Sequence, residues 1–390
     1  MKDDILLVHL PDTPMDGSKP VFTPPIGLWS MRTNNFGKKV RVLDANIHRD
    51  FVERADIAGY SIMFPEHIRY LDSARSCIYA KKEVLGGPTG GNTIELGMES
   101  IRGPGENWLA EKAVSFSLLR PPEFSRYEMD PYWKLGAPFS GLPSTSRWMP
   151  VETSRGCPNE CGFCAIPSLW GRWIPRPLEA LDEYFTYLIG EHQVEEIIVI
   201  DDNIAVSAVR FIAIIELFKK YGLSWSITNG IYNRSLLRLD VQEAIKDSRC
   251  LYLSLPFEAG NQHTANLMNL GKKYLTFEEA MQLTNKTKEL GIHTAGQFVI
   301  GYPGETEEDV RETLKYANAL SLDQRHIHIA TPFKGTPMYE TCEKNNYLAD
   351  SISKATYKIP VIETPMLSRE VLYKIWKEDR ENALQRKEGI

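Results

Sequence analysis

The stretch TSRGCPNECGFC, residues 153–164, places three cysteines, Cys157, Cys161 and Cys164, at the spacing C-x3-C-x2-C. It follows a short apolar run at residues 148–151 and leads into a loop. Cysteine thiolates are the protein ligands that hold iron–sulfur clusters. Three thiolates on one tight loop can hold three irons of a four-iron cluster and leave the fourth iron open for chemistry. The spacing therefore predicts a reactive iron–sulfur site rather than an electron carrier, which uses four cysteines.

Two other uses of clustered cysteines compete with this one. A structural zinc site takes four ligands, commonly in two C-x2-C pairs, but this chain has no second pair and its nearest downstream histidine is His192. A disulfide would leave one of the three thiols unpaired and would need an oxidising compartment. Six cysteines in 390 residues, three of them clustered, instead suit a reducing cytoplasm.

The composition is that of an ordinary globular protein, with 43% hydrophobic and 25% charged residues and a net charge of -6. Because the chain has no long basic run, we expect no nucleic-acid partner. No apolar run approaches the roughly 18 residues that span a bilayer, so we expect no membrane segment. The start, MKDDI, carries acidic residues and does not resemble a secretion signal, which again predicts a cytoplasmic protein.

The first 120 residues predict an α/β layer with parallel strands. Short apolar runs suggest four buried strands, at residues 5–10, 40–44, 57–62 and 82–88, with a helix that opens at residue 24. This alternation is typical of a doubly wound fold, in which ligands bind at the carboxyl ends of the strands.

From Met149 onward, strand and helix signals alternate six times. The strands are expected at residues 148–151, 194–200, 224–230, 250–256, 294–301 and 326–330. Six strand–helix units fit a partial (β/α)6 barrel of the TIM type, whose chemistry collects at the carboxyl ends of its strands. We therefore divide the chain into a Rossmann-like domain (1–120), an irregular linker rich in Pro, Gly and Ser (121–148), the barrel (149–345) and a charged helical tail (346–390).

The cysteine motif resembles the signature of the radical SAM superfamily, in which an aromatic residue, here Phe163, precedes the third cysteine. The partial barrel is also that family's fold. The resemblance implies a 4Fe-4S cluster on the three cysteines and S-adenosylmethionine (SAM) on the open iron. Reductive cleavage of SAM would yield a 5'-deoxyadenosyl radical that abstracts hydrogen from the substrate, with the electron coming from a reductant such as flavodoxin or ferredoxin.

The resemblance also implies SAM contacts at the ends of the predicted strands. The residues it indicates are Phe163, Asp201, Asp202, Arg234, Glu258, Ile300 and Gly301. Carboxylates suit the SAM ammonium group, and the fork geometry of Arg234 suits a carboxylate. Structural roles stay open, because one aspartate can cap the next helix and Arg234 can form a surface ion pair. His326 and His328 alternate along one strand, so they face one side and either contact substrate or join the core.

The N-terminal half resembles the cobalamin-binding Rossmann-like domain that is fused to one radical SAM subgroup. The matching pieces are ILLVHLPDTP (5–14), PPIGL (24–28), VRVLDAN (40–46), the pair Gly86-Gly87, and GPGE (103–106). The domain is compressed, and it lacks the D-x-H-x-x-G motif that gives a histidine to cobalt in many cobalamin proteins. Cobalamin therefore stays open as a third cofactor, and the alternative is a vestigial domain that buttresses the barrel.

We expect a single-cluster radical SAM enzyme that acts on a small molecule in specialised metabolism. Because the N-terminal domain is shortened, we expect a reaction without methylation; the alternative is a cobalamin-dependent methyltransferase acting on an unactivated carbon or phosphorus centre. An alternative of another class is a non-catalytic iron–sulfur or zinc protein. Only Cys77 precedes the motif and only Cys342 follows Cys250, which argues against the tRNA methylthiotransferases and against members with auxiliary clusters.

Overall fold

The computed structural model describes residues 4–10, 24–45, 48, 51–61, 68–86, 98–101, 104–135 and 145–388. The chain divides into two compact units, one made of Met1–Gly156, Leu169–Val199 and Tyr221–Leu223, the other of Cys157–Ser168, Ile200–Lys220 and Ser224–Ile390. This division differs from the domain boundaries drawn from the sequence, which stay a prediction. Each unit is described by itself.

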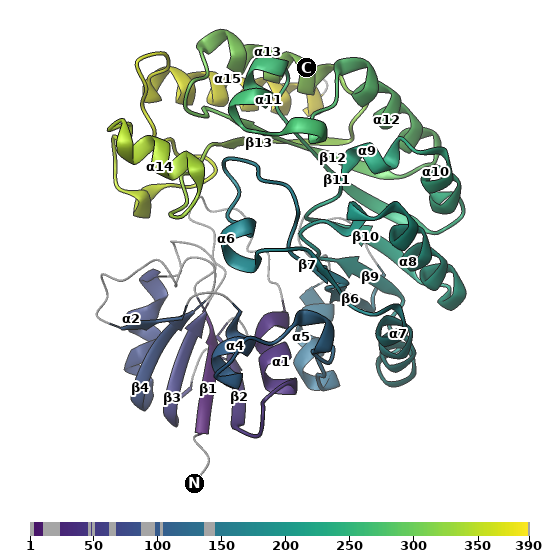
Figure 1. Ribbon diagram of the computed structural model, residues 1–390, viewed down its shortest axis with the longest axis vertical. Helices are drawn as coiled ribbons and strands as arrows, with labels where there is room; N and C mark the ends of the chain where they lie inside the picture. The colour runs from purple at the N-terminus through teal and green to yellow at the C-terminus, as the bar shows by residue number, and fades with distance from the viewer. Residues whose placement is uncertain are drawn as a thin grey trace. The chain divides into compact units, whose positions relative to one another are not determined.

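Five parallel strands form the N-terminal sheet, in the order β2-β1-β3-β4-β5 (Figure 1). Their bounds are β1 Asp4–His9, β2 Lys39–Asp44, β3 Glu53–Ser61, β4 Ile78–Gly86 and β5 Glu99–Ser100. The chain places β2 on one side of β1 and then β3 to β5 on the other, so the strand order reverses at β1. This is the flavodoxin-like form of the doubly wound fold.

Helices contribute side chains to the cores on both faces of this sheet because β1 is apolar on both sides. Leu6 belongs to a buried cluster with Leu71 of α2, whereas its neighbour Ile5 belongs to one with Met31 of α1 and Leu109 of α4. The helices are α1 Ile26–Thr33, α2 Ile68–Ser76 and α4 Gly105–Ala110, followed by the short 3-10 turn η3 at Phe116–Leu118. The predicted Rossmann-like layer is confirmed.

A helix, α5 at Arg126–Leu135, lies where the sequence predicted an irregular linker. Ser125 precedes α5, and its backbone N–H and its hydroxyl both donate hydrogen bonds to Oε2 of Glu128, over 2.8 and 2.9 Å. This is the S-x-x-E pattern of a capping box. Pro131 inside the helix removes a backbone donor and obscures the helical spacing of the buried side chains Met129 and Tyr132. The expectation of irregular structure is wrong for residues 126–135, whereas the linker as a boundary between domains stays a prediction.

Six strands form the second sheet, in the order β13-β12-β11-β10-β9-β6. Their bounds are β6 Trp148–Val151, β9 Glu196–Val199, β10 Ser224–Ile227, β11 Cys250–Glu258, β12 His293–Ile300 and β13 Gln324–Ile329. Every strand pair whose register is resolved runs parallel. A short antiparallel pair, β7 Ser154–Arg155 with β8 Ile174–Pro175, flanks the cysteine loop. Six successive parallel strands confirm the predicted partial barrel.

The helices of this half follow the strands in alternation. They are α6 Ile166–Trp170, α7 Leu178–His192, α8 Ala208–Tyr221, α9 Asn233–Leu236, α10 Leu239–Ile245, α11 Gln262–Leu267, α12 Phe277–Glu289, α13 Glu307–Ala319, α14 Pro337–Lys344 and α15 Arg369–Glu388. The 3-10 turns are η4 Ile204–Val206, η5 Gly271–Lys273 and η6 Ile352–Lys354. Thr276 and Thr306 begin α12 and α13 with complete capping boxes, which sets where these two helices start.

One face of strands β10 to β13 packs against helices. Trp225 of β10 lies against Phe211 and Phe218 of α8, with ring centroids 6.1 and 5.6 Å away. Further along, Ile300 of β12 shares a buried cluster with side chains of α13 and α15, among them Leu372. Figure 1 draws these helices along one side of the strands and the cysteine loop on the other. The opposite face is therefore the one available to the cysteine loop.

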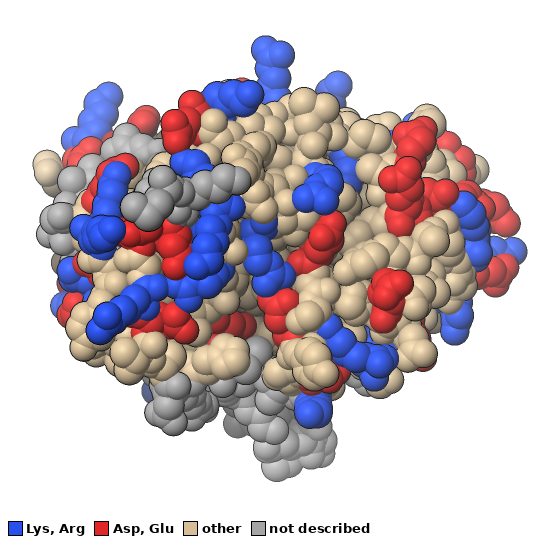
Figure 2. Space-filling view, turned by 90° about the horizontal axis from the view of Figure 1, so that it is seen from below, with Lys and Arg blue, Asp and Glu red and all other residues tan. Residues whose placement is uncertain are grey.

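No helix in the described part of the chain is long and apolar enough to cross a membrane. On the face drawn in Figure 2, basic and acidic side chains are interspersed. The expected absence of a nucleic-acid partner and the cytoplasmic location stay predictions.

Candidate active site at the cysteine loop

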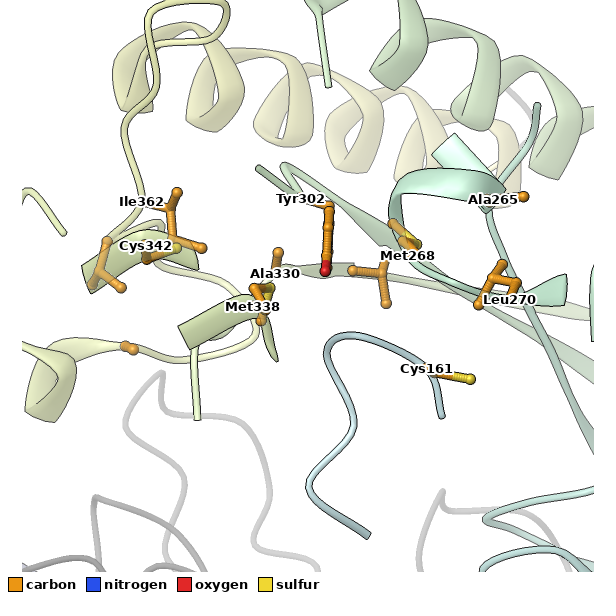
Figure 3. Close-up of a cluster of buried hydrophobic side chains, with 13 residues drawn as sticks. Cys161, Ala265, Met268, Leu270, Tyr302, Ala330, Met338, Cys342 and Ile362 are labelled. Carbon is orange, nitrogen blue, oxygen red and sulfur yellow. The ribbon is translucent and has the colours of Figure 1, made fainter. Parts of the chain in front are cut away.

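Backbone hydrogen bonds on both sides of Gly162 fix the cysteine loop. The Gly162 N–H donates to the carbonyl of Met268 over 2.8 Å, and the Gly162 carbonyl accepts from the N–H of Met338 over 2.9 Å. A Cβ at this position would overlap the Tyr302 hydroxyl, so a larger residue after Cys161 would require the Tyr302 side chain or the loop to move. Figure 3 shows Cys161 on the side of Met268 and Leu270, and Tyr302 and Met338 belong to the same buried cluster.

The three thiols lie in a largely apolar setting. Cys161 is buried, while Cys157 and Cys164 are half-buried. Burial raises the pKa of the Cys161 thiol and raises that of Cys164 to about 12, while the ammonium of Lys273 acts in the opposite direction on both. The bare loop therefore favours thiols, and a bound metal centre would be needed to hold the thiolate forms.

The donor set suits a cluster better than a single ion. In the part of the chain that the structure describes, no three His, Cys, Asp or Glu side chains converge closely enough to hold one metal ion. A zinc ion would draw its thiolates to about 2.3 Å from a single centre, whereas a four-iron cluster presents several irons to separate cysteines. Three thiols spaced along one loop fit the second arrangement.

Asn203, which the sequence analysis did not single out, contacts the first cysteine. Its side-chain Nδ2 donates to the Cys157 sulfur over 3.6 Å, and the side chain is only 4% exposed. Its Oδ1 is buried without a hydrogen-bond partner among the described residues, which leaves an acceptor beside the thiols. Asn203 directly follows the predicted pair Asp201 and Asp202, so its place at a strand end was the available signal.

A buried ion pair lies beside the other two cysteines. Nζ of Lys273 is 2.7 Å from Oε1 of Glu258, and the two side chains are 12% and 10% exposed. Lys273 also lies over the ring of Phe163, 5.9 Å from its centroid. Glu258 was a predicted SAM contact, whereas Lys273 was not among the predicted residues.

The remaining predicted residues lie at the expected strand ends in varied settings. Asp201 is buried and Asp202 half-buried at the end of β9. A Cβ on Gly230, beyond β10, would overlap the carbonyl of Asp202, so these two strand-end segments meet closely. The guanidinium of Arg234 pairs with Glu279, at 2.6 and 3.0 Å. Its role as a SAM contact stays a prediction, and in this structure its side chain anchors the start of α12.

The segment after β12 forms a tight turn. Gly301 has φ +81°, and Tyr302 donates its N–H to Oε2 of Glu305 over 2.7 Å, which closes the turn. The side chain of Ile300 faces the helices, and its carbonyl accepts from the N–H of Ala330 over 2.9 Å. Ile300 can therefore offer a ligand only its backbone.

A row of polar side chains crosses the sheet on the face opposite Ile327 and Ile329. Gln297 donates from Nε2 to the hydroxyl of Ser254 over 3.0 Å and shares a 2.8 Å hydrogen bond through Oε1 with Nε2 of His328. The ring of His326 stacks beside His328 at 6.3 Å. The two histidines thus face one side, as their alternation predicted, and that side is the one away from the helices.

Comparison with known proteins identifies the catalytic half. Residues 151–317 match the family model described as the radical SAM superfamily. The chain contains a radical SAM domain. The 4Fe-4S cluster and SAM that the sequence predicted are the cofactors of this superfamily. The cysteine loop lies within the matched residues, and its role in holding the cluster stays a prediction.

The similarity to curated relatives extends beyond that domain. An uncharacterized methyltransferase, PH0819, of Pyrococcus horikoshii is 30% identical over 65% of this chain and 53% of its own length. The cytidylyl-2-hydroxyethylphosphonate methyltransferase of Streptomyces wedmorensis is 28% identical over 63% of this chain and 47% of its own length. The chain thus spans about half the length of these curated relatives.

A solved structure resembles nearly the whole fold. The radical SAM methyltransferase TsrM of Kitasatospora setae, solved with cobalamin and a [4Fe-4S] cluster, aligns with a TM-score of 0.67 at 17% identity and covers 90% of this chain and 80% of its own. This similarity confirms the combination of a cobalamin-binding-like N-terminal fold with a partial barrel.

The relatives contradict one prediction made from the sequence. The expected reaction without methylation is wrong, because the relatives that match over 65% and 63% of this chain are named as methyltransferases. The error came from the compressed N-terminal domain and its missing histidine motif. A histidine motif reports how cobalt is ligated, whereas the fold depends on the buried strands, and those are complete here.

Proposed function

We propose that this chain is a cobalamin-dependent radical SAM methyltransferase that acts on a small molecule. The observation that carries the proposal is the N-terminal sheet in the order β2-β1-β3-β4-β5, present in the same chain as a radical SAM domain. The methyltransferases among the relatives support it. When bound, the cluster supplies an electron to the sulfonium of SAM, and cobalamin carries a methyl group.

The strand order indicates where cobalamin would bind. In flavodoxin-like sheets the ligand lies at the carboxyl ends of the strands, where the order reverses, which here is between β1 and β3. At the same edge, a Cβ on Gly86, the last residue of β4, would meet no atom within 4 Å. The loops that follow β1, β3 and β4 lie outside the described residues.

The cysteine loop and strand ends would hold the other two cofactors. Cys157, Cys161 and Cys164 would hold the cluster. The buried acceptor Oδ1 of Asn203 would accept a hydrogen bond from an N–H or O–H group of a ligand bound beside it. The groups proposed to position SAM are Phe163, Asp201, Asp202, Arg234, Glu258, Ile300 and Gly301. Of these, Glu258 and Arg234 already have partners in the chain, so they would act together with Lys273 and Glu279.

The polar row of Ser254, Gln297 and His328 would contact the substrate. Burial lowers the pKa of His328 to about 4, so its imidazole is neutral near pH 7 and donates from the nitrogen that faces Gln297. Its other ring nitrogen is then an acceptor for a substrate N–H or O–H. Tryptophan is the substrate in one TsrM complex, and we propose a small organic substrate here too. A flavodoxin or ferredoxin would supply the electrons.

The proposal is tested by cobalamin uptake and SAM turnover. Anaerobically reconstituted protein, incubated with cobalamin and desalted, should retain cobalt and visible corrinoid absorbance. With a reductant, it should convert SAM to S-adenosylhomocysteine only when cobalamin is bound. Cys161→Ala is the matched control, because it should retain cobalt but lose reductive SAM cleavage. Cluster-loaded protein that binds no cobalamin, or forms S-adenosylhomocysteine equally without it, would contradict the proposal.

A further inference from the structure

Lys273 is a cation enclosed by the protein next to the cysteine loop. It ends the short turn η5, and its side chain is 12% exposed, unlike that of its exposed neighbour Lys272. An unpaired ammonium is costly to bury, so it needs a fixed partner. Glu258 is that partner, at 2.7 Å, and attraction to its carboxylate offsets the cost of burial.

The position of Glu258 is built into the sheet. Its register with β12 shifts between Pro256 and Glu258, which marks a bulge at the end of β11. Glu258 itself has φ +67°, a left-handed conformation that residues with a side chain adopt at an energetic cost. The fold therefore tolerates strain at the residue that fixes the ammonium of Lys273, and strain of this kind gathers at functional sites.

The ammonium faces the part of the loop that carries two cysteines. It lies 5.9 Å from the ring centroid of Phe163, the residue just before Cys164. The surrounding buried side chains are apolar, among them Met268 and Leu270. A charge acts strongly in such a setting, because a low local dielectric constant screens an electrostatic interaction only weakly.

A fixed cation beside an iron–sulfur cluster stabilises its reduced state. Reduction adds one negative charge to a centre already bound by thiolates, and the reduction potential depends on net charge, hydrogen bonds to sulfur and solvent exposure. We propose that Lys273, held by Glu258, raises the reduction potential of the cluster at the cysteine loop. This inference rests on the radical SAM function proposed above and assigns a role to a residue outside the cysteine motif.

The two members of the ion pair make opposite predictions. Lys273→Met removes a positive charge while keeping an apolar stem, so the midpoint potential should become more negative. Glu258→Gln removes a negative charge from the same pair, so the potential should become less negative. Lys273→Arg keeps the charge and should stay near the wild-type value. A purely structural ion pair would not give shifts of opposite sign.

The experiment is a redox titration of each reconstituted protein, followed by the electron paramagnetic resonance (EPR) signal of the reduced cluster. Lys272→Met is the matched control, because it removes an exposed charge from the adjacent residue and should leave the potential unchanged. Iron content and thermal unfolding show whether each variant is loaded and folded. Should Lys273→Met not hold a cluster, Glu258→Gln still tests the sign of the shift, and Lys273→Arg still tests whether the potential depends on the charge alone.

Two results would overturn this inference alone, and a third would overturn the proposed function with it. Equal potentials for the wild type and a loaded Lys273→Met protein would overturn it, as would shifts of the same sign for Lys273→Met and Glu258→Gln. A folded wild-type protein without any four-iron signal would overturn the proposed function as well, so the two failures are distinguishable.

Discussion

At the scale of single residues, Gly162 is a tightly held part of the cysteine loop. Both of its backbone polar groups are hydrogen-bonded, and a Cβ would overlap the Tyr302 hydroxyl. We predict that Gly162→Ala displaces the loop and lowers iron retained after reconstitution several-fold. The measurement is iron per chain after desalting, together with the EPR signal of the reduced protein.

Gly190 provides the matched control for that substitution. It lies inside α7, where a Cβ would meet nothing within 4 Å. Gly190→Ala should leave iron content unchanged and stabilise the protein by roughly 0.5–1 kcal/mol, because alanine favours the helix. Equal iron loading in both variants would contradict the role assigned to Gly162.

His328 should make stability depend on pH in a defined window. Burial is the main reason why the pKa of His328 is lowered from 6.5 to about 4. Between these two pH values the unfolded chain therefore binds more protons than the folded chain. Stability is therefore lost as the pH falls from about 6.5 to about 4. His328→Asn should reduce this part of the pH dependence, measured as melting temperature against pH, whereas the exposed His263→Asn should not. Parallel profiles for all three proteins would contradict the assignment.

Some residues of the site could be predicted from sequence and others could not. The cysteines could, because their spacing is local and serves one chemistry well. Asn203 and Lys273 could not, because their significance depends on what they contact: Cys157 is 46 positions from Asn203, and Glu258 is 15 positions from Lys273. Arg234 was predicted as a SAM contact, but its pairing with Glu279 is visible only in the folded chain.

At the scale of elements, the contribution of Ser125 and Glu128 to the start of α5 can be tested. Ser125→Ala removes the hydroxyl that donates to Glu128 but keeps the backbone N–H that donates to the same carboxylate, so we expect a loss of about 0.5–1 kcal/mol, that of one hydrogen bond. We predict faster hydrogen exchange in α5 and a lower urea midpoint. Ser115→Ala is the control, because Ser115 precedes η3 without a side-chain cap and should have little effect. Unchanged exchange in α5 would contradict the assignment.

Strand and helix positions were largely predictable, and the reason is physical. Strands buried on both faces read as short apolar runs, and helices such as α12 and α13 begin at Thr-x-x-Glu and Thr-x-x-Asp capping patterns. α5 was missed because Pro131 interrupts its pattern. The bulge at Glu258 could not be predicted, because it arises from the register between β11 and β12.

At the scale of the whole molecule, buried charges tie distant segments to the strand before the cysteine motif. Arg155 contacts Glu152 at 2.8 Å and Glu106 of α4 at 3.4 Å, and its guanidinium lies over the rings of Phe116 and Trp170. All of these residues belong to one compact unit. The GPGE segment that the sequence matched to a cobalamin-type domain thus contacts the residue two positions before Cys157.

This contact predicts a global effect from a conservative change. Arg155→Lys keeps the charge but loses the planar fork, and disrupting a buried pair costs about 3–5 kcal/mol when one partner is removed outright. We therefore expect a lower melting temperature and reduced iron retention. Arg238→Lys, in an exposed pair with Asp240, should change neither. Wild-type stability and iron content in Arg155→Lys would contradict the account.

The fold could be predicted over both halves of the chain, but the reaction could not. Both sheets follow from local patterns, whereas the proposed methylation would depend on a cofactor at strand ends, where the loops contribute little regular pattern. The shortened connections after β2 and β4 therefore led to the wrong reaction while the strands beside them were correctly predicted.

The central claim is that the cysteine loop holds a four-iron cluster that binds SAM. The most direct measurement is the EPR spectrum of anaerobically reconstituted, dithionite-reduced protein, with and without SAM. We predict about four irons per chain, a four-iron signal that changes when SAM is added, and loss of that signal in Cys157→Ala, Cys161→Ala and Cys164→Ala. Folded protein without a four-iron signal, or a signal that SAM leaves unchanged, would contradict the claim.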